Sequence, residues 1–167
     1  MVDAERSVVM SETADAGFAT FHARWRDPLR RALAQALGSV SLADEAIDEA
    51  MTRAAATWDQ IGVYESPQGW VYRVGLNWAR GIFRKRRREV LTEIFADTAQ
   101  ESRVPDLDLL RAVGQLPIRQ RSIVVARYYL DWSTAEVAAA LDVPEGTVKS
   151  RLSRALARLA KDLGESP

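Results

Sequence analysis

The sequence predicts an all-α protein made of two small helical domains joined by a flexible acidic linker. In several segments apolar residues recur at steps of three and four, which is the spacing of one face of a helix. The net charge is zero, yet residues 61–90 hold seven basic and two acidic side chains, and residues 111–167 hold nine and six. Residues 91–110 hold one basic and five acidic side chains. Overall neutrality therefore hides two basic surfaces suited to nucleic acid.

The chain of 167 residues suits two small domains, and its composition excludes several classes. We expect an N-terminal tail over 1–17, a helical domain over 18–90, a linker over 91–110, a second helical domain over 111–163 and a C-terminal tail over 164–167. The chain has no cysteine, which excludes disulfides and thiolate metal sites. It also has no signal-like start and no apolar run of the roughly 20 residues that a membrane span needs. A cytoplasmic protein without a membrane segment is expected.

The first domain is predicted to contain an acidic helix and a basic, aromatic helix. Residues 41–58 form the acidic one, with an apolar face made of Leu42, Ala46, Ile47, Ala50, Met51 and Ala54. After a loop over 62–67, residues 69–89 interleave aromatic rings with arginines and Lys85. Rings stack on unpaired bases and cations follow phosphates, so this mixture suits melted DNA. Two other interpretations stay open: Trp70 and Trp78 are core residues of a bundle, or the run 84–88 is only a solvated helix end or a non-specific nucleic-acid patch.

The second domain is predicted to contain a helix-turn-helix over 133–163, supported by a helix that starts at Pro117. Ser133 and Glu136 have the spacing of a capping box, and residues 142–144 form the turn. In the helix that follows, the predicted buried side consists of Val148, Leu152, Leu156, Leu159 and Leu163.

Polar and basic side chains occupy the other face of this last helix. The second helix of a helix-turn-helix enters the major groove by its N-terminal residues, where arginine and lysine pair with guanine. The predicted DNA contacts are Thr147, Lys149, Ser150, Arg151 and Arg154. The alternative is an ordinary helix with a solvated basic face, and it requires the capping box, the turn and the donors to coincide by chance.

Residues 116–159 resemble region four of bacterial RNA polymerase sigma factors of the extracytoplasmic-function group, most specifically in the run Glu-Gly-Thr-Val-Lys-Ser-Arg at 145–151. The N-terminal half resembles sigma region two, which melts promoter DNA in that family. The resemblance implies that the downstream promoter element and its melted strand contact Trp70, Tyr72, Arg73, Asn77, Arg80, Arg84 and Lys85, the last three through phosphates. It also implies polymerase docking through Glu45, Asp48 and Glu49. Two departures from the family are the absence of a glutamine in this docking motif and Gly81 in the promoter-reading helix.

The resemblance implies a transcription initiation factor that binds core RNA polymerase, recognises promoter DNA and promotes strand opening. It implies a monomer when free, and it allows an inhibitory anti-sigma factor as a partner. We expect no cofactor, no metal and no enzymatic activity, since the lone His22 has no catalytic or ligating partner in the sequence. Two alternatives remain: a stand-alone dimeric helix-turn-helix regulator, and an inactive decoy that binds polymerase or an anti-sigma factor.

Overall fold

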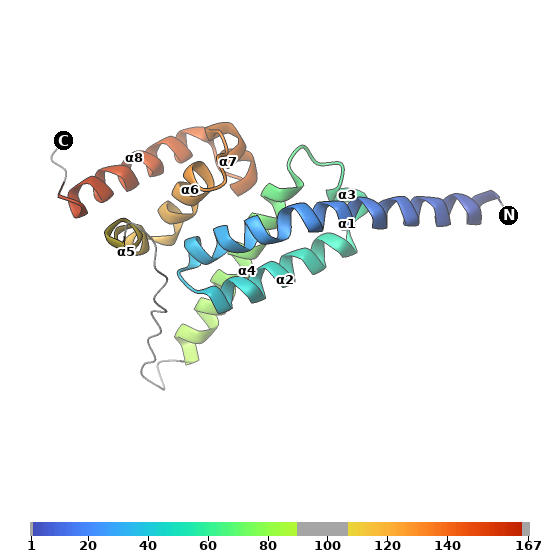
Figure 1. The fold of residues 1–167 in the computed structure, drawn as a ribbon, viewed down its shortest axis with the longest axis horizontal. Helices are drawn as coiled ribbons and strands as arrows, with labels where there is room; N and C mark the ends of the chain where they lie inside the picture. Colours follow the sequence, from blue (N-terminus) through green and yellow to red (C-terminus); the bar gives the residue numbers. More distant parts are fainter. Residues whose placement is uncertain (1, 90–106, 165–167) are drawn as a thin grey trace.

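The computed structural model describes residues 2–89 and 107–164, with side chains placed for 16–85 and 108–164. Within those residues the regular elements are all helices, which confirms the predicted all-α class (Figure 1). The helices are α1 (Val2–Leu37), α2 (Val40–Ala56), α3 (Trp58–Ile61), α4 (Pro67–Glu89), α5 (Leu107–Gln115), α6 (Ile118–Tyr128), α7 (Thr134–Leu141) and α8 (Glu145–Asp162). None of the helices in the described ranges is long and apolar enough to span a membrane.

Two helices extend into segments that were expected to be a tail and a linker, and the division into domains stays a prediction. Residues 2–17, expected as a tail, belong to the first turns of α1, and residues 107–110 of the expected linker are the first turn of α5. The rest of the expected linker, 91–106, lies outside the described residues, as do residues 165–167 of the C-terminal tail.

Helices α1 to α4 form the N-terminal module, whose first two helices are joined by a tight connection. Gly38 adopts a left-handed φ of 69°, and Ser39 caps α2 by accepting a hydrogen bond from the backbone N–H of Leu42 at 3.2 Å. The predicted apolar face of α2 is buried throughout. Many of its residues are alanines, so α1 and α4 can approach α2 closely.

The short helix α3 is held by an aromatic cluster. The ring of Trp58 lies 5.4 Å from Phe18 and 4.8 Å from Phe21, centroid to centroid. These separations are within the range of favourable aromatic pairs. The cluster thus packs α3, which follows α2, against α1. This packing also sets the position at which the loop leading to α4 begins.

Helices α5 to α8 form the C-terminal module, and α7 and α8 are the predicted helix-turn-helix. The capping box is present: Ser133 Oγ accepts from the Glu136 N–H at 3.2 Å, and Glu136 Oε2 accepts from the Ser133 N–H at 2.6 Å. Asp142 ends α7 in the left-handed conformation with a φ of 56°, and α8 begins directly after Pro144. These contacts fix the angle at which α8 leaves the turn.

One predicted core position of α8 is wrong. Leu156 is 40% exposed, whereas Ala155 is fully buried beside Val148 and Leu159. The buried stripe therefore advances by steps of four, three and four through Val148, Leu152, Ala155 and Leu159. An alanine fits there because the helix lies close to α6, and the sequence pattern had favoured the larger leucine next to it.

The two modules pack on each other through a continuous apolar core. Helix α7 lies against α4, and α6 lies between α1 and α8 (Figure 1). Gly69 of α4 packs directly against α7, since a Cβ atom there would lie 2.8 Å from Cβ of Ala140. The ring of Trp132 meets the ring of Tyr72 edge-on at 5.7 Å. The surface of α4 that faces α7 and α6 is consequently covered in this arrangement.

Candidate nucleic-acid interface

The N-terminal half of α8 presents most of its predicted DNA contacts away from the rest of the protein. Lys149, Ser150 and Arg154 are exposed, and Thr147 is half-buried. The hydroxyl of Ser150 donates to the Thr147 carbonyl oxygen at 3.1 Å, and Lys149 Nζ lies 3.8 Å from a Glu145 carboxylate oxygen. An exposed ion pair of this kind is weak, so Lys149 is available to a phosphate or a base.

Arg151 differs from its neighbours on α8. It is half-buried at the edge of the apolar stripe and lines a cavity shared with α4 and α6. The structure therefore separates Arg151 from the three exposed predicted contacts, Lys149, Ser150 and Arg154.

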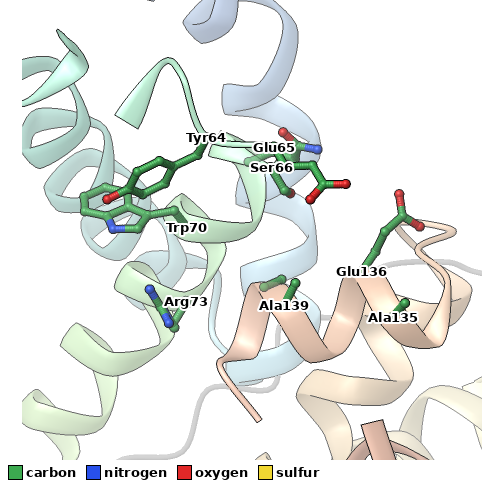
Figure 2. Close-up of a pocket in the computed structure, with 10 residues that line it drawn as sticks. Tyr64, Glu65, Ser66, Trp70, Arg73, Ala135, Glu136 and Ala139 are labelled. Atoms are coloured by element: carbon green, nitrogen blue, oxygen red, sulfur yellow. The ribbon is translucent and has the colours of Figure 1, made fainter. Parts of the chain in front are cut away.

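On α4, Trp70 and Arg73 line a first cavity of about 350 Å³ between the two modules. Figure 2 shows the rings of Tyr64 and Trp70 together on one side, with Arg73 on the next turn of α4 and Ala139 on the opposite wall. Arg73 Nη1 also lies 3.2 Å from Asp142 Oδ2 in the turn of the helix-turn-helix. Two rings and a guanidinium can hold a flat base by stacking, but α7 forms one wall of this space.

Tyr72, predicted to contact the melted strand, has no exposed surface. Its hydroxyl donates to the backbone carbonyl of Ser122 at 3.1 Å, and burial raises the pKa of this phenol well above its usual range. Contact between this ring and DNA requires α6 to move away from α4, so the contact stays a prediction.

Asn77 and Arg80 line a second cavity, of about 270 Å³, together with Arg73, Arg119 and Arg151. We call it the arginine cavity. Burial lowers the pKa of Arg80, and the neighbouring charges of Arg119 and Arg151 lower it further. Two other predicted contacts, Arg84 and Lys85, are exposed near the C-terminal end of α4. The structure thus places Asn77 away from the cavity of Trp70 and beside a cluster of guanidinium groups.

The predicted polymerase-docking carboxylates of α2 lie at its surface. Glu45 is exposed, while Asp48 accepts a hydrogen bond from Arg26 Nη2 at 2.6 Å and Glu49 accepts one from Arg53 Nε at 2.7 Å. Exposed ion pairs of this type contribute little free energy, so these carboxylates can bind basic groups of another protein instead. The acidic face is therefore accessible, with two of its three carboxylates already facing arginines.

Three residues of these sites were not predicted from the sequence: Arg119, Ser122 and Asp142. Arg119 lies in the helix assigned only a supporting role, Ser122 acts through its backbone carbonyl, and Asp142 was assigned only to a turn. All three residues contribute to contacts or cavities between the two modules. Packing between segments that are distant in the sequence cannot be predicted from a local pattern.

Comparisons with known proteins found a matching family model, similar relatives and similar solved structures. Residues 106–159 match the family model "Sigma-70, region 4". The RNA polymerase sigma-E factor of Streptomyces avermitilis is 34% identical over 126 residues, covering 72% of this chain and 70% of that protein. The ECF RNA polymerase sigma factor SigL of Mycobacterium tuberculosis is 32% identical over 154 residues, covering 84% and 82%.

Among solved structures, the sigma factor RpoE of Bartonella quintana, crystallised with the anti-sigma factor NepR, has the same fold. It aligns with a TM-score of 0.76 at 24% identity, over 90% of this chain and 98% of that one. CnrH, in complex with the cytosolic domain of CnrY, aligns with a TM-score of 0.64 at 22% identity, over 95% and 97%. With relatives this similar over most of their length, the chain belongs to the extracytoplasmic-function sigma factors of bacterial RNA polymerase, a family of transcription initiation factors.

Proposed function

We propose that this protein binds core RNA polymerase and directs it to promoters whose upstream element is read by α8. The observation that carries the proposal is the reading end of α8, where Lys149, Ser150 and Arg154 are exposed behind a capped turn. Side chains at this end of the second helix are the ones that reach base edges in a helix-turn-helix. The module packing does not cover them, so the upstream contact needs no rearrangement.

The downstream element is assigned to α4, which carries aromatic rings beside guanidinium groups. Stacking on rings can hold an unpaired base, and unstacking it costs a few kcal/mol. In the packed arrangement α7 and α6 cover Tyr72 and one side of Trp70. We therefore propose that the modules separate when the protein binds polymerase, which frees α4 for the melted strand.

The acidic face of α2 is assigned to polymerase docking. Glu45 is exposed there, and Asp48 and Glu49 face Arg26 and Arg53 across short ion pairs. The proposal includes a cytoplasmic location, where polymerase acts, and assigns no catalytic reaction to the chain. It also includes an anti-sigma factor as a partner, since the structurally similar RpoE of Bartonella quintana was crystallised with the anti-sigma factor NepR.

Run-off transcription tests the proposal. Purified bacterial core polymerase is incubated with this protein on a pool of promoter fragments from its own genome. Discrete transcripts that require the protein are expected. Binding to core enzyme without transcripts would instead indicate a decoy, and duplex binding as a dimer without polymerase would indicate a stand-alone regulator.

Asn77→Ala separates strand opening from polymerase binding. Asn77 is exposed on α4, and its side-chain oxygen accepts a long hydrogen bond from Arg80 Nη1 at 3.5 Å. Loss of so exposed a side chain should leave the fold and the association with polymerase unchanged. Promoter opening, followed by permanganate reactivity of unpaired thymines, should fall. A variant that opens promoters normally would remove Asn77 from the proposed contacts.

A further inference from the structure

The arginine cavity concentrates positive charge from three helices. Arg73 and Arg80 come from α4, Arg119 from α6 and Arg151 from α8, and Asn77 and Ser122 also line the space. Among the described residues that line it, none is acidic. In the described part of the chain, the ion pair that this set makes is between Arg73 and Asp142, whose side chain is 83% exposed. Within the described ranges, four guanidinium groups therefore line one space, and one solvent-exposed carboxylate is paired with them.

Such a cluster is unfavourable when nothing negative occupies it. Arg80 has lost part of its hydration, and its Nε is buried without a hydrogen-bond partner among the described residues. The charges of Arg119 and Arg151 repel it in addition, as its lowered pKa reflects. A packed interface usually avoids unpaired buried donors and like charges, so this one has the properties of a site that lacks its ligand.

We propose that the arginine cavity binds a small phosphate-class anion, with inorganic pyrophosphate as the representative ligand, and that the bound anion ties α4, α6 and α8 together. Guanidinium groups match phosphate oxygens through paired N–H donors, and Asn77 and Ser122 add polar groups to the wall. A volume of about 270 Å³ admits a phosphate or pyrophosphate group. A DNA duplex is far larger than this space, which is open to solvent beside Arg119 and Asn77.

A bound anion would also affect DNA binding, because it would occupy arginines that are proposed to contact DNA. Arg73, Arg80 and Arg151 are among the proposed DNA contacts, so an anion on them competes with promoter phosphates. This consequence rests on the proposed function, whereas binding of the anion rests on the cavity alone. The two are tested separately, since binding can be measured without polymerase or promoter.

The test is isothermal titration of the full chain with inorganic pyrophosphate at an ionic strength of roughly 0.15 M, where non-specific surface attraction is screened. Saturable binding at one site is expected. Arg119→Ala should weaken it by about tenfold, the loss expected for one charge-assisted hydrogen bond. Arg119 is exposed and outside the proposed DNA and polymerase contacts, so this variant should still support transcription. Arg119→Lys, which keeps the charge but not the paired donors, should bind more weakly than the unchanged protein.

Arg31→Ala is the matched control, because it removes one arginine from an exposed position of α1 away from the cavity. It should bind pyrophosphate within about twofold of the unchanged protein, as expected for a distant surface charge. Absence of saturable binding would overturn the proposal, as would equal losses for Arg119→Ala and Arg31→Ala. Binding of short single-stranded DNA that depends on Arg119, with no binding of pyrophosphate, would overturn it in favour of a nucleic-acid contact.

Discussion

Arg151 and Arg154 lie on adjacent positions of one helical face, yet their surroundings differ. Arg151 is half-buried at the arginine cavity, whereas Arg154 is exposed at the reading end of α8. Both were predicted as equivalent DNA contacts from residue type and spacing. The distinction arises because α4 packs beside Arg151, and packing between distant segments has no signature in the local sequence.

Arg154→Ala should weaken binding to the preferred promoter by about 1–3 kcal/mol if the side chain pairs with a base. Binding to unrelated sequences should change little. Arg158→Ala, one turn further along α8 and also exposed, is the control: a phosphate contact there lowers affinity on all sequences alike. Fluorescence anisotropy on matched and scrambled duplexes measures both. A uniform loss for Arg154→Ala would assign that residue to phosphate contact as well.

The contribution of the α7 capping box to the stability of the protein depends on pH through the carboxylate of Glu136. The backbone N–H of Ser133 donates to its carboxylate, which lowers the pKa of Glu136 below its ordinary value of 4.5, and the Ser133 side chain adds to the effect. A carboxylate with a lowered folded-state pKa stabilises the fold above its unfolded pKa, and the contribution is lost as the pH falls through the folded pKa.

Glu136→Gln should therefore lower the free energy of unfolding at about pH 7, and the difference from the unchanged protein should shrink by about pH 3. Urea denaturation at the two pH values measures it. Glu65→Gln, at an exposed position outside the capping box, controls for the loss of any carboxylate. A difference that is independent of pH would show that the charge of Glu136 does not act through the cap.

At the scale of elements, the amphipathic pattern predicted which helices exist better than which residues each one buries. The apolar face of α2 and the capping box of α7 were predicted correctly, because local spacing and capping chemistry determine them. In α8 the choice between Ala155 and Leu156 was wrong. Two adjacent apolar residues both fit a helical face, and the packing of α8 against α5 and α6 decides which one is buried.

This outcome gives a prediction for two leucines of α8. Leu159→Ala should lower the free energy of unfolding by about 2–4 kcal/mol, because the side chain is 7% exposed and its loss leaves a cavity. Leu156→Ala should cost less than about 1 kcal/mol, since that side chain is 40% exposed. Chemical denaturation of both variants measures the difference. Equal losses would mean that the core of the C-terminal module follows the originally predicted stripe.

At the scale of the whole molecule, the sequence predicted two helical modules and their basic surfaces but not their packing on each other. Tyr72 was assigned to DNA on the strength of its neighbours, and the structure finds its ring against Trp132 and its hydroxyl on Ser122. An aromatic residue such as Tyr72 can pack against another helix or stack on a base, because a surface that stacks on bases is also apolar enough to bind a helix. Which contact is made depends on the separation of the modules.

The separation of the modules can be changed at Gly69. A Cβ atom there would lie 2.8 Å from Cβ and 3.1 Å from Cα of Ala140, and these atoms are fixed to the backbone of α7. Gly69→Ala should therefore push α7 away from α4. Gly81→Ala is the control in the same helix: nothing lies within 4 Å of its Cβ, so it should leave the packing unchanged and stabilise α4 by about 1 kcal/mol.

The chain has no cysteine, so T52C and S153C, at exposed positions of α2 and α8, allow a fluorophore pair to be attached across the two modules. Energy transfer should decrease in Gly69→Ala and stay unchanged in Gly81→Ala. Because opening uncovers Tyr72 and the adjacent side of Trp70, the Gly69→Ala protein should also bind single-stranded promoter DNA more tightly. Unchanged energy transfer in both variants would mean that the contact at Ala140 does not hold the modules together, and the covered surface of α4 would then need another explanation.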